Sequence, residues 1–313
     1  MRKIIFVLAL LVPSRGLAAG GADPYAFLLL DSNARAAAMG GAYTSLASGT
    51  GALNYNAAGL SRTARHEVSF MHNQYFQGIT QEFLHYASPY GWGVSFNQLS
   101  FGKVSVTTLD APDGSGMGDT TMNDLALGTG YGLKLGESLS VGAGAKYIRE
   151  TIDATTRNNV AFDLGALYAV PAMKRLSFGA AMQNLGQTVR YDRVKENQPL
   201  MFRLGGSYVR EFLGASHTLS IDIIKERSDS AYAAVGVETV VLKTLDLRLG
   251  YNQSNDAGPG ITAGVGYEIS DLVFDYSIVP YGHLGCSHRM ALSFRWGGEK
   301  NMEVPGTVYI SPK

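Results

Sequence analysis

Apolar side chains stand at every second position along much of this 313-residue chain. In residues 261–269, for example, positions 261, 263, 265, 267 and 269 are apolar, and the positions between them carry Thr, Gly or Glu. Such alternation predicts β-strands with one apolar face and one polar or small face. The sequence therefore predicts an all-β fold. The same pattern recurs in segments 125–133, 139–147, 162–170, 176–182, 202–208, 219–223, 245–251, 272–278 and 289–296.

The length of these segments selects the kind of β fold. Strands of soluble proteins average about 5–6 residues, whereas these segments approach the length of about ten that a tilted strand needs to cross a bilayer. Charged residues make up only 17% of the chain, against about 25% in an ordinary soluble domain. Both observations favour a transmembrane antiparallel β-barrel over a soluble sandwich.

Counting the segments gives a topology of fourteen strands, an even number that places both ends of the barrel on one side of the membrane. Short connections alternate with longer ones, so we expect tight periplasmic turns and longer outer loops, such as 110–121, 151–157 and 186–199. Tyrosines gather near strand ends, as in the aromatic belts of membrane barrels. The predicted strands are 66–76, 80–88, 91–109 with a bend at Gly102, 122–133, 138–149, 158–170, 175–185, 200–210, 217–226, 231–241, 244–252, 259–269, 272–279 and 287–296.

The beginning of the chain has the pattern of a secretory signal. Arg2 and Lys3 precede an unbroken apolar run over residues 4–12, and small residues follow at 16–19. That run is well short of the roughly 20 residues that a spanning helix needs. We therefore predict a cleaved signal peptide at 1–19 and a place in the bacterial outer membrane, with both termini periplasmic.

Residues 20–64 do not alternate and are predicted to be a partly helical segment inside the barrel. Asp31 or Ser32 is expected to cap a short helix over 34–39, which the next two glycines end. A Gly-rich stretch, 48–60, leads into the first strand. We expect the segment to enter from the periplasm and to close the lumen. The residues predicted to form this plug are Gly40, Gly41, Asn54, Asn56, Gly59 and Leu60.

The last strand resembles the insertion signal of outer-membrane proteins, which is read by the barrel-assembly machinery. Phe294 and Trp296 supply its alternating aromatics, although Ala291 stands where Gly is usual. The barrel is thus predicted to span residues 65–297. Residues 298–313 form a polar tail that we expect in the periplasm.

Two stretches carry a resemblance to a known family. Residues 41–44 with 52–60 resemble the N-terminal hatch of FadL-like barrels, and within that group they look most like the PorV/PorQ family. Residues 275–289 are similar to that family's final hairpin. Ala57 replaces a proline that is usual there, and Cys286 stands where a polar or acidic residue is usual. The resemblance implies a fourteen-stranded barrel with a hatch in its lumen. Family members include channels for hydrophobic compounds and a type IX secretion shuttle.

A set of charged residues falls on the polar phase of the strands. Because charge on the lipid face costs about 2–4 kcal/mol at mid-bilayer, these side chains must point inward. We expect them to form ion pairs across the lumen rather than an ion-selective ring, and Asp163, Arg248 or Arg289 to meet the hatch. The residues are Asp163, Asp222, Asp246, Arg248, Glu268, Asp275, Arg289 and Arg295.

No motif predicts an enzyme, a metal site or a cofactor. His283, Cys286 and His288 are zinc-type ligands, but three so close together strain a tetrahedral shell. Asp110, Asp113 and Asp119 lack the spacing of an EF-hand, because Pro112 takes the third ligand position. The Gly-rich run 128–132 is followed by no helix, and no Ser–His pair suggests lipolysis.

The charge balance of the chain bears on its expected partners. Lys+Arg number 26 and Asp+Glu number 26, so no positive surplus is available for nucleic acid. Membrane lipid is the expected surrounding. Two functions remain open: a gated channel for hydrophobic small molecules, and an accessory or shuttle protein that carries secreted protein cargo in a type IX-like system. Modest polar outer loops favour the channel.

Overall fold

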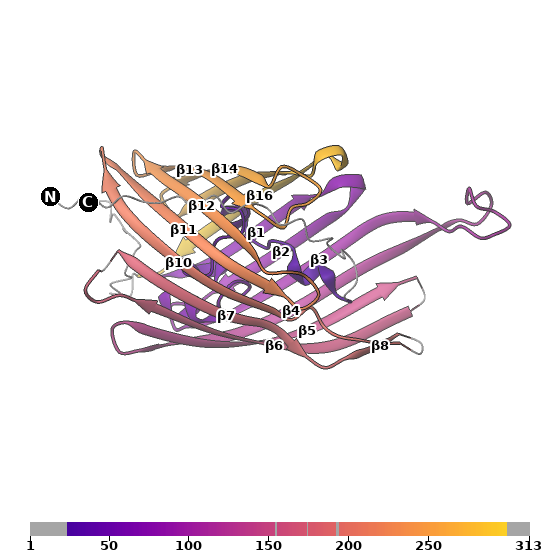
Figure 1. The fold of residues 1–313 in the computed structure, drawn as a ribbon, viewed down its shortest axis with the longest axis horizontal. Helices are drawn as coiled ribbons and strands as arrows, with labels where there is room; N and C mark the ends of the chain where they lie inside the picture. Colours follow the sequence, from indigo (N-terminus) through magenta and orange to yellow (C-terminus); the bar gives the residue numbers. More distant parts are fainter. Residues whose placement is uncertain (1–23, 154, 174, 192–193, 299–313) are drawn as a thin grey trace.

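A computed structural model describes residues 24–298 except 154, 174 and 192–193. The predicted signal peptide and almost all of the predicted C-terminal tail lie outside the described residues. In the described part, fourteen antiparallel strands form a closed barrel, as predicted (Figure 1). They are β1 (His66–Gln74), β2 (Thr80–Ala87), β3 (Trp92–Ser105), β4 (Asp119–Leu135), β5 (Leu139–Ile152), β6 (Thr155–Ala169), β7 (Leu176–Gly186), β10 (Met201–Phe212), β11 (Ala215–Glu226), β12 (Tyr232–Val241), β13 (Leu245–Asn252), β14 (Ile261–Ile269), β15 (Leu272–Pro280) and β16 (Cys286–Trp296).

The barrel closes where β1 pairs with β16, with His66 opposite Trp296 and Gln74 opposite His288. Side chains alternate across the wall. Outward positions carry exposed apolar residues such as Leu204, Ile223 and Leu249, and inward positions carry glycine or buried polar residues. A continuous apolar outer surface suits lipid rather than water.

Some predicted boundaries were wrong. Strand β3 ends at Ser105 instead of 109, β4 begins at Asp119 instead of 122, and strands occupy most of the predicted loop 151–157. The connection after β7 contains a small hairpin, β8 (Val189–Tyr191) with β9 (Val194–Glu196). These errors concern parts near the barrel rim, where both faces of a strand meet water and the apolar alternation fades.

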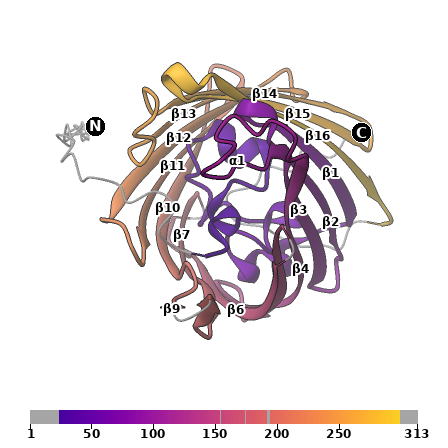
Figure 2. The same ribbon diagram turned by 90° about the vertical axis from the view of Figure 1, so that its right-hand side faces the viewer.

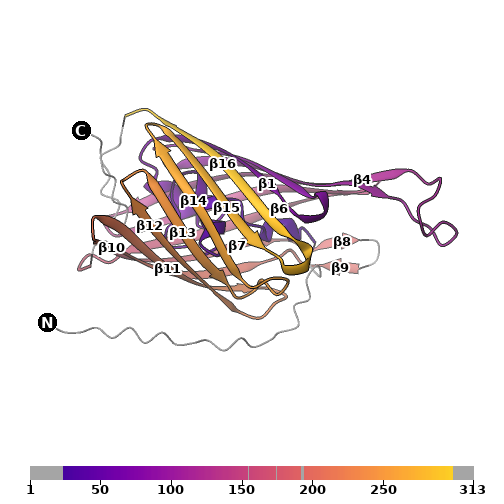
Figure 3. The ribbon, with the colours of Figure 1, turned by 90° about the horizontal axis from the view of Figure 1, so that it is seen from above.

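The two ends of the barrel differ. One end, called here the short-turn end, has tight turns such as residues 213–214 and 242–243, all with the positive φ that such hairpins require. The other, the long-loop end, carries a β3–β4 ribbon that projects far beyond the rim (Figures 1 and 3). The ribbon bends at Gly102, where the register shifts between Ser100 and Lys103, as the sequence predicted.

Residues 24–64, called here the inner segment, lie inside the barrel (Figure 2). The segment contains η1 (Ala26–Leu29), α1 (Ala34–Ala38), η2 (Gly49–Gly51) and η3 (Ala57–Arg62). Helix α1 packs beside β13, β14 and β15, while η3 packs beside β4, β5 and β6. Further 3-10 turns, η4 (Phe76–Gly78) and η5 (Gly282–Leu284), lie in long-loop-end connections.

Two expectations about the inner segment were wrong. Asn33, rather than Asp31 or Ser32, caps α1, since its side-chain oxygen accepts the Ala36 N–H at 3.1 Å. The segment was also expected to enter from the periplasmic side, where the tight turns were predicted. The described chain instead begins near the long-loop end, because the Tyr25 N–H reaches Glu150 near the end of β5. It then runs down the lumen to the short-turn end. No helix in residues 24–298, as far as the structure describes them, is long and apolar enough to cross a membrane.

Candidate functional site

Inward-facing glycines make room for the inner segment. A Cβ added to Gly132 would lie 2.6 Å from the Ser61 nitrogen, and one added to Gly179 would lie 2.6 Å from the Thr44 carbonyl oxygen. At Gly142, Gly165 and Gly250 the segment is closer still. The many glycines of the strands thus allow close contact between two backbones.

Asp222 on β11 is the main polar anchor of the segment. Its carboxylate oxygen Oδ2 accepts the backbone N–H groups of Tyr43 at 3.1 Å and Thr44 at 2.9 Å, and also the Thr44 hydroxyl. Arg203 on β10 lies 3.7 Å from the same carboxylate and donates to the Thr44 hydroxyl and the Gly41 carbonyl. Asp222 is 0% exposed, so water does not compete for these bonds.

A second anchor joins α1 to a charged row on the wall. Arg35 donates to both carboxylate oxygens of Glu238 on β12, at 2.7 and 2.6 Å. Glu238 also pairs with Arg248 on β13, and Arg248 pairs in turn with Asp246 and Asp275. The predicted lumen charges therefore pair along the wall, within one strand or between strands at most two apart, and the expectation of pairs across the lumen was wrong. The inner segment occupies the space that such pairs would have to cross.

The remaining predicted lumen charges have separate partners. Asp163 pairs with Lys146 at 2.9 Å and bonds to the wall instead of to the inner segment. Arg295 pairs with Glu67 and Glu268 near the short-turn end. Of the three charges expected to meet the segment, Asp163 thus bonds elsewhere and Arg248 reaches it only through Glu238.

The predicted plug residues all lie in the lumen. Gly40 donates to the Thr262 hydroxyl at 3.0 Å, and Gly41, with φ of 83°, directs its carbonyl to Arg203. The Asn54 carbonyl accepts from Gln183, and the Asn56 amide donates to the Ala166 carbonyl at 3.0 Å. The last two pack tightly: Gly59 lies against the Ala47 carbonyl, and Leu60 belongs to a buried apolar cluster.

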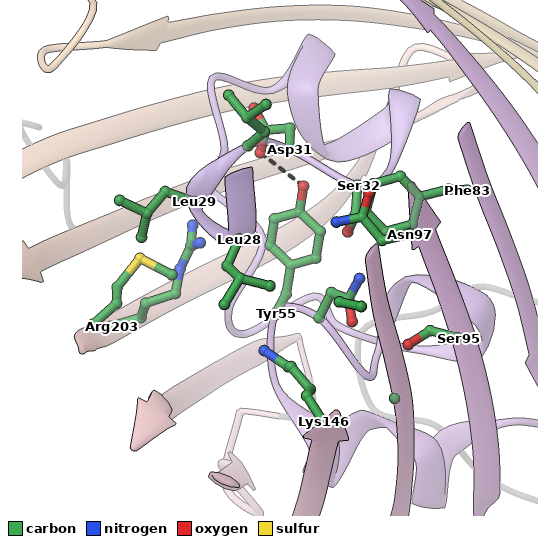
Figure 4. Close-up of a pocket in the computed structure, with 15 residues that line it drawn as sticks. Leu28, Leu29, Asp31, Ser32, Tyr55, Phe83, Ser95, Asn97, Lys146 and Arg203 are labelled. Carbon is green, nitrogen blue, oxygen red and sulfur yellow. Dashed lines mark hydrogen bonds between the residues drawn. The ribbon is translucent and has the colours of Figure 1, made fainter. Parts of the chain in front are cut away.

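A small cavity of about 30 Å³ remains between the segment and the wall (Figure 4). Apolar side chains from residues 28–30, Phe83 and Met201 line it together with Lys146 and Arg203. In Figure 4 the Tyr55 hydroxyl points to Asp31 and donates to it at 2.7 Å. Burial, together with the adjacent Asp31 carboxylate, raises the pKa of Tyr55 well above its ordinary value, so Tyr55 keeps this proton.

The wall is irregular next to this cavity. The ladder pairs Phe162 on β6 with Leu185 on β7, but then pairs Leu164 with Met182, so Asp163 faces two residues of β7. This is a β-bulge, and Asn184 in it has φ of 60°. The Asp163 carboxylate accepts the Asn184 N–H at 2.8 Å and so replaces a bond of the ladder.

Lys146 completes the inner side of the bulge. Its ammonium group donates to the Asn184 side chain at 2.8 Å and pairs with Asp163. On the lipid side of the same stretch lies an open groove of about 640 Å³. Lys146 lines the inner cavity and its neighbour Tyr147 lines the groove, so the two spaces lie on opposite faces of β5. The groove is lined by Tyr147, Asn158, Asn159, Val160, Phe162, Leu185, Gly186 and Gln187.

The residues of the predicted insertion signal lie at the closing seam. Phe294 stacks on Trp296 with ring centres 5.7 Å apart, and Trp296 stacks on His66 of β1 at 5.4 Å. Both side chains are partly exposed on the outer face. Their contacts join the last strand to the first.

The structure does not gather the metal-type residues that the sequence singled out. Among the described residues, no group of three or more His, Cys, Asp or Glu side chains could hold a metal ion. His288 bonds the Tyr276 hydroxyl at 2.8 Å, and Asp113 accepts from Ser115 within its own loop. Those bonds to Ser115 lower the pKa of Asp113 below its ordinary value.

Several functional residues were missed by the sequence analysis. Arg203, Glu238 and Lys146 lie on the polar phase of their strands, and that phase was the signal that could have found them. Arg203 and Glu238 bind inner-segment residues that lie more than 100 residues earlier in the chain, and Lys146 binds at a bulge, which no local pattern indicates.

The comparisons with known proteins bear on the fold. No protein-family model and no curated protein matches the chain. Among solved structures, the chain is similar to the toluene transporter TbuX of Ralstonia pickettii, with a TM-score of 0.56 and 13% identity over 87% of this chain and 100% of that one.

Two further structures give the same result. The toluene transporter TodX of Pseudomonas putida matches with a TM-score of 0.54 and 13% identity, over 84% of this chain and 96% of that one. The monoaromatic hydrocarbon channel CymD matches with 0.53 and 10%, also over 84% and 96%. At these identities the likeness concerns the fold, and it agrees with the FadL-like barrel that the sequence predicted.

Proposed function

We propose that this protein is an outer-membrane channel for hydrophobic small molecules, closed in its resting state by the inner segment. The apolar outer surface supports a place in lipid, and the filled lumen supports a gate rather than an open pore. The solved structures of similar fold are transporters or channels of toluene and other monoaromatic hydrocarbons.

One observation carries the proposal: Lys146, which lines the inner cavity, pairs with Asp163 at the β6–β7 bulge, and the outward residues beside this bulge, Phe162 and Leu185, line the lipid-facing groove. On this proposal, a molecule in the cavity would pass Lys146, Asp163 and Asn184 on its way to the groove. A hydrophobic solute gains free energy by leaving sideways into lipid rather than downwards into water, at about 25 cal/mol per Å² of apolar surface. We propose that the bulge is the exit.

The resting cavity is too small for such a solute. Its volume of about 30 Å³ fits water, whereas a cavity of about 150 Å³ holds benzene. The inner segment must therefore shift before a ring can pass. A shift of Asn54 would disturb the bulge directly, because the Asn54 carbonyl accepts a hydrogen bond from the side chain of Gln183, the residue before Asn184.

Uptake of radiolabelled toluene by Gram-negative cells that express the full-length protein tests this function. Leu185→Trp should fill the groove and slow the initial rate severalfold. Leu249→Trp is the matched control, because Leu249 is an exposed outward leucine on β13, away from the groove. Uptake equal to that of cells without the protein would overturn the function. Equal rates for Leu185→Trp and Leu249→Trp would overturn the exit.

The predicted topology belongs to the same proposal. We propose that residues 1–19 are cleaved as a signal peptide, that residues 20–64 act as the plug and that the C-terminus is periplasmic. Sequencing the N-terminus of the mature protein would test the cleavage. Protease added to intact cells should leave residues 298–313 uncut if this tail is periplasmic.

A shuttle for protein cargo, as in the PorV/PorQ resemblance, is the second candidate. The projecting β3–β4 ribbon favours it, because Leu109 at its tip is 102% exposed and Met117 is exposed nearby. Replacing residues 106–118 by a two-residue turn would separate the candidates. Loss of surface-attached proteins with normal toluene uptake would support the shuttle, and unchanged surface proteins would exclude a role for the ribbon.

A further inference from the structure

A buried guanidinium lies partly unsatisfied in the wall near the long-loop end. Arg289 on β16 points inward and is 1% exposed. Within the described part of the chain, its Nε and Nη1 groups have no hydrogen-bond partner. Ser277 stands opposite Arg289 on β15 and is 0% exposed. Its hydroxyl also has no hydrogen-bond partner among the described residues. A buried cation without full pairing destabilises a fold, so this arrangement needs an explanation.

Neighbouring groups are already engaged with other partners. Asn73, opposite Arg289 on β1, accepts from Ser287 and donates to Gln81. The Asp31 carboxylate accepts from Tyr55. The Tyr281 hydroxyl is the side-chain partner that Arg289 does have, and Asp31 and Tyr75 are the other titratable groups that face it.

Three aromatic rings gather beside the guanidinium. Tyr75 and Phe76 come from the β1–β2 connection, and Tyr281 comes from the β15–β16 connection. Their ring centres lie 4.4, 5.2 and 5.4 Å apart. All three side chains are only partly buried, so the cluster is reachable from the long-loop end. Such rings favour a further ring in an edge-to-face or offset arrangement.

We infer that Arg289, Ser277 and this ring cluster form a binding site for a monoaromatic carboxylate, of which benzoate is the simplest example. The ring of the ligand would pack on Tyr75, Phe76 and Tyr281. Its carboxylate would accept hydrogen bonds from Arg289 and from the Ser277 hydroxyl, and so give these groups the partners that they lack. The inference rests on the proposed function and refines it: the channel takes aromatic acids as well as neutral hydrocarbons, and it selects them at its entrance.

Equilibrium binding of radiolabelled benzoate to the full-length protein in detergent tests the site. We expect saturable binding at one site, weakened at least about tenfold in Arg289→Gln and by a smaller factor in Ser277→Ala, since bonds to charged groups are the stronger ones. Arg65→Gln is the control, because Arg65 bonds Asp271 at the short-turn end, far from the rings. Acetate should compete poorly, because it has no ring.

The outcomes separate this inference from the function on which it rests. Benzoate binding that is absent, or unchanged in both Arg289→Gln and Ser277→Ala, overturns the site even when toluene uptake is normal. Acetate that competes as well as benzoate overturns the role of the rings. Failed toluene uptake with Arg289-dependent benzoate binding would overturn the hydrocarbon channel and leave the site. If Arg289→Gln does not fold, as judged by heat-modifiable migration, Ser277→Ala decides.

Discussion

Removal of the Asp222 carboxylate should release the inner segment while the barrel stays closed. Asp222→Ala deletes the acceptor of three hydrogen bonds, two from backbone N–H groups and one from the Thr44 hydroxyl. No ladder bond of the wall is lost, because β11 pairs with β10 and β12 through its backbone. The change also removes the ion partner of Arg203, and because Arg203 itself donates to Thr44 and Gly41, the effect falls on the contact between segment and wall.

The free energy that Asp222 contributes to holding the segment can be estimated from its hydrogen bonds. A hydrogen bond to a charged group contributes about 1.5–3 kcal/mol. The three bonds share one oxygen and are not independent, so we take about 3–4 kcal/mol for the set rather than their sum. That free energy raises the population of the released segment by roughly 10²- to 10³-fold. Asp222→Asn keeps the shape and one acceptor and should have a smaller effect.

Single-channel conductance in planar bilayers is the assay. Asp222→Ala should show frequent open events, Asp222→Asn fewer, and the unmodified protein rare ones. Asp271→Ala is the control, since this rim carboxylate pairs with Arg65 at 2.8 Å, away from the lumen. If Asp222→Ala forms a heat-modifiable barrel and still conducts no more than Asp271→Ala, the carboxylate does not hold the segment.

Three further changes test other parts of the account. Gly142→Ala should make the inner segment sensitive to added protease, because the new Cβ collides with the backbone of residues 57–58. Gly206→Ala is the control and should not, because its Cβ meets only a Phe178 ring edge at 3.5 Å. Equal cleavage of the two variants would contradict close packing of the segment against the wall. Lys146→Met leaves the buried Asp163 carboxylate without its cation. It should lower the free energy of unfolding of the barrel by about 3–5 kcal/mol, seen as a lower unfolding temperature. An unchanged melting curve would refute the pairing at the bulge. Phe294→Ala combined with Trp296→Ala should reduce the amount of heat-modifiable barrel in outer-membrane fractions, and a normal amount would remove the insertion-signal interpretation.

The barrel could be predicted from the sequence because lipid imposes a strict rule on each strand. Every second side chain in the membrane must be apolar, and this rule makes strands such as 261–269 visible one at a time. The rule does not apply beyond the rim. The ends of β3 and β4 were therefore misplaced, and the small hairpin in the β7–β10 connection was not foreseen.

The site was harder to predict because its contacts join distant parts of the chain. A short helix over 34–39 was expected, but the choice of Asn33 as its cap depends on how the preceding turn enters the lumen. The polar phase indicated that Asp222 points inward, but not that it would bind the backbone of Tyr43 and Thr44. The bulge at Asp163 also leaves no local mark, since one extra residue in β7 changes only the register between strands.

The central claim is that the inner segment closes the lumen of an otherwise complete barrel. Deleting residues 24–60 while keeping the first 23 residues tests it directly, with ion conductance of the purified protein in planar bilayers as the measurement. We expect the truncated protein to form a heat-modifiable barrel that conducts continuously, because each strand keeps both of its neighbours. A truncated barrel that inserts normally and conducts no more than the full-length protein would contradict the claim.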